Sequence, residues 1–541
     1  MATKSRLPRS SIGAKSPALF SRIRTTLETA YYRNNVIRVN TLEEAYRLAE
    51  HAPGTVVTDM PVHRSEDLGL PADAKVLIFN DGAITGRQAQ ARRLVDDANR
   101  ENFAKTVREG VYESRYRTMY HATAVIGLHG DFSVKAHLLI PEGFENTLYS
   151  WLLNFQVLDE ETAAMYAESD LFENEGDILL YSDPDYYVEG FEDGLALFDR
   201  EHNCAALFGM RYFGEHKKGS LTMAWTIAQR NGFTACHGGQ KRVDLKDKDP
   251  FVMGVFGLSG SGKSTITHSR HNDKYDITVL HDDAFVISEK DTSSVSLEPS
   301  YFDKVQDYPT DSEDNRYLVT LQNVGATLDE DGLVVPVTED IRNGNGRAIK
   351  SKFWTPERRY KFEEKINAIF WIMKDDTLPP LLKVNASDLA STLGATLATK
   401  RTSAEHGVDT TKLAVVPYAN PFRLYPLSHD YKQFKELADK HGVDFYVINT
   451  GFFGEKKIPP KVTLGAIESI MEGTTEYTPF PLLKDVDLAV IEGFVPDFDD
   501  ASYRKTFNER MRTRIDYLKN LEQRDSLPDE AIQSIAKRLH E

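Results

Sequence analysis

The sequence has little cysteine, no long hydrophobic run and no excess of positive charge. Its 541 residues include 2 cysteines, which argues against a disulfide framework and favours a reducing compartment. The most apolar stretch, AIFWIM at residues 368–373, is too short to span a bilayer and is typical of a buried strand. The formal net charge of -17 disfavours nucleic acid and anionic membranes as partners, so an anionic ligand needs a local cationic pocket. We therefore expect a cytoplasmic protein.

The composition and a charged stretch near the middle of the chain predict a globular protein of two lobes. Residues 1–15 are basic and polar without an apolar run of signal-peptide length, and we expect a flexible tail there. No repeat of fixed period is visible, which argues against solenoids and propellers. The charged stretch QKRVDLKDKDP at residues 240–250 is the best candidate for a linker. We therefore predict lobes at residues 16–245 and 246–541.

Hydrophobic spacing indicates both helices and strands. Residues 26–39 (TLETAYYRNNVIRV) read as a helix running into a strand, and residues 74–80 (AKVLIFN) as a strand. Residues 121–140 read as two strands joined by a glycine-containing turn. Near the C-terminus, five apolar residues recur at helical spacing and predict a buried helix face, with a membrane or partner helix as the alternative: Phe507, Met511, Ile515, Leu518 and Leu521.

The stretch GVFGLSGSGKST at residues 254–265 matches the phosphate-loop pattern G-x-x-x-x-G-K-[ST]. An apolar run precedes it, and a helix start and the strand DITVL follow it, which is the order of a mononucleotide-binding unit. Backbone N–H groups of such a loop, with the helix N-terminus, bind phosphate oxygens; a glycine-rich turn without a ligand is the alternative. The predicted nucleotide-binding residues are Gly257, Ser259, Gly260, Ser261, Gly262, Lys263, Ser264 and Thr265.

The side chains near the loop predict how the phosphates and their metal ion are bound. Lys263 would reach the β and γ phosphates, and Ser264 would ligate Mg²⁺. Asp282 and Asp283 close the second strand, where an acidic residue can hold the metal of the nucleotide directly or through water. A paired Asp at a strand end is otherwise a helix cap or a turn.

Three further stretches carry information that the phosphate loop lacks: TGR at 85–87, YFGEHKKG at 212–219 and TEDIR at 338–342. In order with GLSGSGKST and the Asp pair, they resemble the ATP-dependent phosphoenolpyruvate carboxykinases. That family pattern runs T-G-R, Y-A-G-E-M-K-K, a histidine, G-L-S-G-T-G-K-T, Asp-Asp, E-G-G-C-Y-A-K and T-E-N-T-R. INTGFFGEKKIPPKVT at 448–463 resembles the adenine side of the family. The resemblance implies an α/β, two-lobed fold with a phosphate loop in the C-terminal lobe and the active site between the lobes.

The resemblance also implies roles for single residues. Arg87 would bind the carboxylate of oxaloacetate or phosphoenolpyruvate, and Tyr212 would contact the substrate or CO₂. Arg342 would neutralise charge during phosphoryl transfer. Lys457 and Thr463 would lie near the adenine, where lysine stands for the family's arginine and would stack more weakly. Without the resemblance, a surface arginine, a half-buried tyrosine and a rim salt bridge are the ordinary readings of the first three.

A second metal site follows from the same resemblance. Lys218, His237 and Asp283 would hold a transition metal, usually Mn²⁺. A lysine coordinates a cation only when it is neutral, so burial and an adjacent charge, for which Lys217 is the candidate, must lower the pKa of Lys218. His237 lies in HGGQK instead of H-C-S-A-N, and a structural histidine is the alternative.

The implied reaction converts oxaloacetate and ATP into phosphoenolpyruvate, ADP and CO₂. A metal would stabilise the enolate that decarboxylation leaves, and the enolate oxygen would attack the γ-phosphoryl group in line. Residues 387–407 read as a loop rich in Gly, Thr and charge and resemble the approach to the family's mobile lid, which would exclude water.

The chain departs from the family pattern in three further places. Ala-Phe-Val-Ile follows Asp283 in place of Glu-His-Gly-Trp, EPSYFDK at 298–304 puts Phe302 at the tyrosine position, and LQNV at 321–324 replaces LENV. A kinase for a different small organic acid and a non-catalytic nucleotide-binding protein are therefore the alternatives. Pyrophosphate stays open as a donor because the loop reads only phosphates. The sequence gives no oligomeric state.

Overall fold

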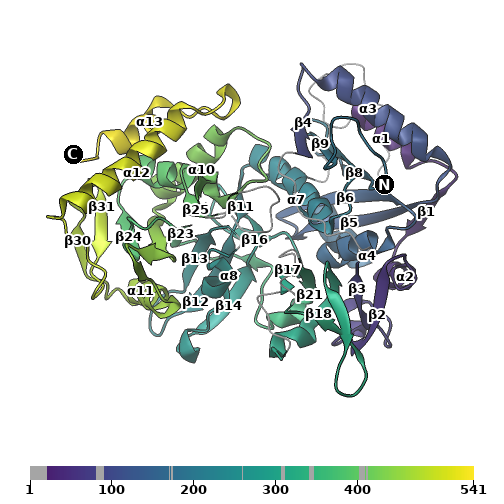
Figure 1. Cartoon of the computed structure of the whole chain (residues 1–541), viewed down its shortest axis with the longest axis horizontal. Helices are drawn as coiled ribbons and strands as arrows, with labels where there is room; N and C mark the ends of the chain where they lie inside the picture. Colours follow the sequence, from purple (N-terminus) through teal and green to yellow (C-terminus); the bar gives the residue numbers. More distant parts are fainter. Residues whose placement is uncertain are drawn as a thin grey trace. The chain divides into compact units, whose positions relative to one another are not determined.

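The structure is a computed structural model that describes residues 21–80, 91–169, 171, 175–258, 260–305, 311–339, 346–400, 409 and 412–540 (Figure 1). These residues form two compact units. Within the described ranges, the first unit comprises residues up to 227 together with 297–356, and the second comprises 228–296, 357–400 and the residues from 409 onward. A stretch from the middle of the chain thus folds with the N-terminal part.

The first unit contains two larger sheets and one hairpin among the described residues. An eight-stranded sheet has the order β1-β5-β6-β8-β10-β9-β4, with β7 beside β5. Its strands are β1 (Val36–Val39), β4 (Arg92–Leu94), β5 (Met119–His129), β6 (Phe132–Pro141), β7 (Gln156–Val157), β8 (Ile178–Asp183), β9 (Leu195–Asp199) and β10 (Cys204–Phe208). A five-stranded sheet, β17-β21-β18-β3-β2, and the hairpin β19-β20 are made of β2 (Thr55–Pro61), β3 (Lys75–Phe79), β17 (Tyr301–Lys304), β18 (Leu318–Gln322), β19 (Gly325–Leu328), β20 (Val334–Val337) and β21 (Arg347–Lys350).

The five-stranded sheet explains why residues 297–356 belong to the first unit. Its β18 pairs in parallel with β3, with Leu321 opposite Ile78, and both strands are buried. The helices of this unit are α1 (Arg22–Ala30), α2 (Leu42–Ala49), α3 (Arg100–Glu113), α4 (Glu145–Asn154), α5 (Glu160–Glu168) and α7 (Phe213–Arg230). The predicted helix and strand at residues 26–39, the strand at 74–80 and the strand pair at 121–140 are confirmed by α1 and β1, by β3, and by β5 and β6.

The second unit is built on another eight-stranded sheet, of order β14-β12-β13-β23-β27-β24-β31-β30 among the described residues. Its strands are β12 (Gly239–Asp244), β13 (Phe251–Phe256), β14 (Asp276–His281), β23 (Ala368–Met373), β24 (Leu381–Val384), β27 (Asp444–Asn449), β30 (Tyr477–Pro479) and β31 (Val486–Ala489). A four-stranded sheet, β11-β15-β16-β22, contains β11 (Phe233–His237), β15 (Ala284–Ser288), β16 (Ser294–Ser296) and β22 (Lys361–Phe362). Two hairpins join β25 (Ala398–Lys400) to β26 (Leu413–Val415) and β28 (Phe452–Phe453) to β29 (Lys456–Lys457).

The central strand β23 is buried along its whole length, which confirms the strand predicted at residues 368–373. It pairs in parallel with β13 on one side and with β27 on the other. Its alternate residues enter two different hydrophobic clusters, Trp371 with one and Phe370 with the other, because successive side chains of a strand point to opposite faces. A strand covered on both faces is apolar throughout, so AIFWIM shows no polar alternation.

Helices supply residues to the clusters on the two faces of this sheet. One cluster includes residues of α9 (Ser387–Ala395), α10 (Leu427–His441), α12 (Ala501–Lys519) and α13 (Asp529–Ala536). The other includes residues of α8 (Lys263–His268) and α11 (Pro460–Glu472). The predicted apolar face near the C-terminus is confirmed, since Phe507, Met511 and the next two residues of the pattern are buried on α12, while the last lies beyond its end. In the described part of the chain, no helix is long and apolar enough to cross a membrane.

Two expectations about loops are wrong. The stretch predicted as a linker contributes β12, which pairs with both β13 and β14 inside the sheet. Its Gln240 and Lys241 are fully buried, and the Gln240 amide nitrogen donates to Ser294 Oγ while Lys241 Nζ donates to the Ile266 carbonyl oxygen. Residues 387–395, expected in a loop, form the buried helix α9. Residues 1–15 and 401–407 lie outside the described residues.

Two helical glycines predict opposite effects of one substitution. A Cβ added to Gly394 in α9 would lie 2.7 Å from Tyr418 and 2.8 Å from Trp371, whereas one added to Gly465 in α11 would meet nothing within 4 Å. Gly394→Ala should therefore destabilise the second unit by about 1–3 kcal/mol through overpacking. Gly465→Ala should stabilise it by about 0.5–1 kcal/mol through helix propensity. Thermal unfolding of both variants beside wild type checks the signs, and a raised Tm for Gly394→Ala would contradict this packing.

Candidate functional site

The loop between β13 and α8, which matches the phosphate-loop pattern, has a tightly turned backbone. Gly260 and Gly262 have φ of 76° and 98°, in the left-handed region that favours glycine. A Cβ on Gly257 would lie 2.3 Å from the Ser261 hydroxyl oxygen, so the loop is also too tight there for a side chain. That hydroxyl is buried and has no hydrogen-bond partner among the described residues. Ser259 lies outside the described residues.

The predicted strand, loop, helix and strand are confirmed as β13, the loop, α8 and β14, and they bring Lys263, Ser264 and Asp282 together. The Lys263 ammonium donates to the carbonyl oxygen of Asp282 and lies 3.5 Å from Asp283 Oδ1. Ser264 Oγ donates to Asp282 Oδ2 at 3.0 Å. A hydroxyl beside a carboxylate is a donor set that Mg²⁺ uses at nucleotide sites, so these residues fit the ion. Thr265, one residue further on α8, is exposed.

The carboxylate of Asp282 is held in its charged form. Burial raises its pKa, but the hydrogen bond and charge of His268, followed by the charges of Lys263 and His281, outweigh burial and hold the pKa well below its usual range. The His268 Nε2 atom lies 3.4 Å from Asp282 Oδ2. Asp282 is therefore anionic at neutral pH, which is the state that a metal ligand requires.

His237 and Asp283 meet because their two strands pair. In the antiparallel ladder of β11 and β15, His237 lies opposite Ala284, and Gly238 N donates to Asp283 O at 3.1 Å. His237 Nε2 then lies 3.0 Å from Asp283 Oδ1. The apolar residues that replace Glu-His-Gly-Trp form the buried strand β15 and so build the ladder that aligns this pair.

The hydrogen bonding of His237 indicates what can lie between these two atoms. Nδ1 is bonded to the carbonyl oxygen of Ala419, an acceptor, so Nδ1 carries a proton and Nε2 is the ring atom that faces Asp283. A lone pair facing a carboxylate oxygen needs a cation or a proton between them. The 3.0 Å separation is that of a hydrogen bond or ion pair, and each of the two atoms is also a type of metal ligand. A carbonyl behind the second ring nitrogen is also the usual partner of a ligating histidine.

His237 and Asp283 are too few ligands to hold a metal ion by themselves. Among the described residues, no group of three or more His, Cys, Asp and Glu side chains comes together in a way that could hold a metal. The predicted third ligand, Lys218, is a lysine on α7 of the first unit. It is half-buried, with its ammonium 5.8 Å from the Trp225 ring centroid.

Tyr212 precedes α7 and is buried over its first turn. A Cβ on Gly214 would lie 2.4 Å from the Tyr212 ring, so only glycine leaves room for the ring there. Gln322 Oε1 accepts from Phe213 N at 3.2 Å, and Gln322 Nε2 donates to Arg211 O at 3.3 Å. A glutamate in the family's LENV could not donate the second bond, which gives a physical reason for glutamine in LQNV.

Lys217 has a partner that the sequence did not reveal. Its side chain is fully buried, and its ammonium lies 3.1 Å from Glu298 Oε1, a carboxylate to which Asn154 also donates. The same ammonium is 5.2 Å from the Phe302 ring centroid. The segment at 298–304 therefore surrounds Lys217 with a countercharge and an aromatic face. That countercharge weakens the effect of Lys217 on its neighbour Lys218.

Besides Ser259, two predicted site residues lie outside the described part of the chain. Arg87 falls within residues 81–90 and Arg342 within residues 340–345. The strands on either side of Arg342, β20 and β21, belong to the first unit.

A pocket of about 910 Å³ lies beside the loop, entirely within the second unit. Thr450, which lines it, donates from Oγ1 to the Ser261 carbonyl at 2.6 Å. Lys374, which also lines it, donates to the Gly260 carbonyl at 2.6 Å. Of the two residues predicted near the adenine, Lys457 is exposed and lines the pocket, while Thr463 is buried on α11.

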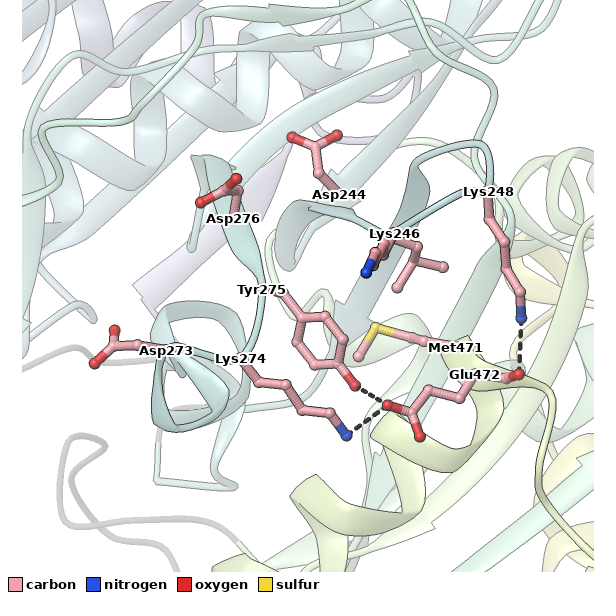
Figure 2. A pocket seen from close by; sticks show the side chains of 10 residues that line it. Asp244, Lys246, Lys248, Asp273, Lys274, Tyr275, Asp276, Met471 and Glu472 are labelled. Carbon is pink, nitrogen blue, oxygen red and sulfur yellow. Dashed lines mark hydrogen bonds and ion pairs between the residues drawn. The ribbon is translucent and has the colours of Figure 1, made fainter.

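A second pocket, of about 560 Å³, lies at the C-terminal end of α11 (Figure 2). Figure 2 shows Lys274 and Tyr275 pointing to the Glu472 carboxylate, which they contact at 2.5 and 2.6 Å. Lys248 donates to the Glu472 backbone carbonyl at 2.8 Å. Because Glu472 already engages these cations, this pocket is a poorer phosphate site than the pocket beside the loop.

A buried network supports the far end of the loop helix α8. Lys241 Nζ donates to the carbonyl oxygens of Ile266 and Ser269, at 2.7 and 3.3 Å, and lies 2.9 Å from His271 Nε2. His271 Nδ1 lies 2.7 Å from Glu468 Oε1 on α11. No sequence pattern indicates this network, because Lys241 lies in the stretch predicted to be a linker.

The comparisons with known proteins agree on one family. The sequence profile described as phosphoenolpyruvate carboxykinase matches residues 52–501. The chain is 24% identical over 303 residues to the phosphoenolpyruvate carboxykinase (ATP) of Aeropyrum pernix, covering 54% of the chain and 60% of that relative. It is 21% identical over 457 residues to that of Bacillus subtilis, covering 78% and 82%. It is 24% identical over 323 residues to that of Campylobacter lari, covering 57% of the chain and 59% of that relative. The match thus spans about three fifths of the Aeropyrum and Campylobacter proteins.

The stability of the loop helix should depend on pH through Lys241. Burial lowers the pKa of Lys241 to about 7, while Glu468 acts in the opposite direction. The unfolded chain, with a lysine pKa of about 10.4, then binds the extra proton between these values, so stability should rise with pH from about 7 upward, by at most about 1.4 kcal/mol per pH unit.

Lys241→Met should flatten this rise, whereas the exposed Lys246→Met should keep it. The measurement is Tm between pH 6.5 and 9.5. The same slope in wild type and Lys241→Met would show that Lys241 does not titrate there.

Proposed function

We propose, because this chain belongs to the phosphoenolpyruvate carboxykinase family, that it decarboxylates and phosphorylates oxaloacetate with ATP to give phosphoenolpyruvate, ADP and CO₂. The observation that carries the proposal is the pair of adjoining contacts after β14, Ser264 Oγ with Asp282 Oδ2 and His237 Nε2 with Asp283 Oδ1, which we propose as two cation sites. One lies at the phosphate loop, and the other shares its strand end. Two charge-stabilising sites side by side suit a reaction that makes an enolate and then phosphorylates it.

The nucleotide would bind through the loop. Its backbone N–H groups would hold phosphate oxygens, and Lys263 would turn from the Asp282 carbonyl to the β and γ phosphates. Ser264 and Asp282 would hold Mg²⁺. The base and ribose would lie in the pocket lined by Lys457, near Thr463.

The second metal would be held by His237, Asp283 and Lys218. A divalent cation bound there, proposed as Mn²⁺, would supply positive charge near the enolate oxygen. His237 would keep its proton on Nδ1, held by the Ala419 carbonyl, and so offer Nε2 as the ligand. Lys218 would have to bind as the neutral amine.

The substrate would be bound by residues of 16–245, and the nucleotide by residues of 246–541. Arg87 would pair with a carboxylate of oxaloacetate in bidentate fashion, and Tyr212 would contact the substrate or CO₂. Arg342 would neutralise charge on the transferred phosphoryl group. The buried ring of Tyr212, packed over Gly214, supports its role because it needs no reorganisation to receive a ligand.

A second candidate, a kinase for another small organic acid, is favoured by the setting of Phe302. This ring replaces a tyrosine of the family pattern and lies near Lys217 and Phe213, so one hydroxyl is missing from that region. Phosphorylation of other 2-oxo and 2-hydroxy acids by the same protein tests this candidate directly.

The test of the proposed reaction is a coupled assay. Purified protein receives phosphoenolpyruvate, ADP, bicarbonate, Mg²⁺ and Mn²⁺, and malate dehydrogenase reports oxaloacetate through loss of NADH. Wild type should turn over, and Lys263→Met should lower kcat by about 10³-fold because phosphoryl transfer depends on charge neutralisation. Lys290→Met, at an exposed lysine, is the control. A folded, ATP-binding protein without turnover in either direction would contradict the proposal.

The second metal site has its own test. Asp283→Asn should weaken Mn²⁺ binding by at least about 10-fold, since it removes one anionic ligand. Electron paramagnetic resonance of free Mn²⁺ during titration measures the change without any turnover. Asp273→Asn, at an exposed carboxylate, should leave the affinity unchanged. Equal affinities for Asp283→Asn and wild type would exclude Asp283 as a ligand.

A further inference from the structure

Three neighbouring parallel strands end at the phosphate loop. β13 leads into it, β27 is followed by Thr450, and β23, which lies between them, is followed by Lys374. Because the strands are parallel, their carboxyl ends lie at the same edge of the sheet, where ligands bind in open α/β sheets. Thr450 and Lys374 each donate to a carbonyl of the loop, at Ser261 and Gly260.

The two acids that follow Lys374 in the chain pair with arginines and not with Lys374. Asp375 Oδ2 accepts from Arg514 at 2.9 Å, and Asp376 Oδ1 accepts from Arg510 at 3.5 Å. Lys374 instead donates to the neutral Gly260 carbonyl. An ammonium group has three donors, so a lysine bonded to one carbonyl can also bind an anion.

The surroundings of Lys374 favour the binding of an anion. Burial, and then the charge of Lys400, lower the pKa of Lys374 below its usual value. Lys400, Lys412 and Lys457 line the same pocket, so cations exceed acids there although the whole chain is strongly acidic. An anion bound at Lys374 would relieve the repulsion between these lysines.

We propose that Lys374 is a nucleotide-binding residue that contacts the phosphate chain while it holds the Gly260 carbonyl of the loop. The inference rests on the proposed function and names a second lysine besides Lys263. The two act from different sides of β13 in the strand order. The Lys263 ammonium contacts the residues that follow β14, whereas Lys374 follows β23. Polyphosphate in the loop would thus lie between two cations.

The experiment is calorimetric titration of the full chain with Mg-ATP, Mg-ADP and tripolyphosphate, at low and high salt and without the second substrate. Lys374→Met should weaken Mg-ATP binding by about tenfold, the usual size of a charge-assisted hydrogen bond, and Lys374→Arg should recover most of the affinity. Tripolyphosphate should lose affinity as well, because it carries the phosphates alone. Lys290→Met, at an exposed lysine, should bind like wild type.

Salt separates a phosphate contact from a brace that only shapes the loop. A lost ion pair makes binding less sensitive to ionic strength, so Lys374→Met should show a shallower salt dependence than wild type. Unchanged ATP affinity in Lys374→Met, or weaker affinity with an unchanged salt dependence, would overturn the proposal. A wild-type protein that binds no ATP would overturn the proposed function with it, whereas wild-type binding with no effect of Lys374→Met overturns this inference alone.

A footprint on the wild-type protein covers the case in which Lys374→Met does not fold. Acetylation of lysines, read by mass spectrometry, should fall at Lys374 when Mg-ATP or tripolyphosphate is present and should stay constant at Lys290. Equal acetylation of Lys374 with and without ligand would contradict the proposal.

Discussion

The parallel pairing of β13, β23 and β27 is the constraint on which the candidate site depends. Parallel strands bring their carboxyl ends to one edge, so three segments that are far apart in sequence begin their loops side by side. The first becomes the phosphate loop, and the other two bind carbonyls of that loop through Lys374 and Thr450. Burial of the central strand on both faces leaves little freedom for this register to shift.

The electrostatics of the site follow from what each strand end carries. After β14 come Asp282 and Asp283, which face the ammonium of Lys263. On the other side of β13, lysines predominate in the pocket beside the loop. A chain of net charge -17 thus concentrates cations where a polyphosphate would bind and carboxylates where its metal would bind. Local fields of this kind act at short range, whereas the charges of the chain that lie more than a Debye length away are screened by salt.

The sequence predicts the parts of the fold that depend on local pattern. AIFWIM is apolar throughout because it is buried on both faces, and the glycines of the loop are required by positive φ and close contacts. It did not predict β12, since charged residues in the stretch at 240–250 hide a strand whose Lys241 is satisfied by carbonyls of α8 and of the residue after it. A buried, hydrogen-bonded lysine looks like a solvated one until its partners are known.

The same limit applies to the site. The order of the motifs identified Lys263, Asp282 and His237, and the structure places His237 beside Asp283 through the ladder of β11 and β15. The Glu298 partner of Lys217 and the contact of Lys374 with the loop join segments that are far apart in the sequence, which no spacing in one sequence encodes. A lysine directly after a buried strand parallel to β13 is the signal that would have pointed to Lys374.

Hydrogen–deuterium exchange with and without Mg-ATP tests most directly where the nucleotide binds. Bound nucleotide should protect the loop at 257–263 and residues 450–454, which meet at the sheet edge. Exchange should not change at residues 244–248 and 273–276, which line the pocket at the end of α11. Protection confined to that second pocket, with exchange in the loop unaltered, would contradict the assignment of this sheet edge as the nucleotide site.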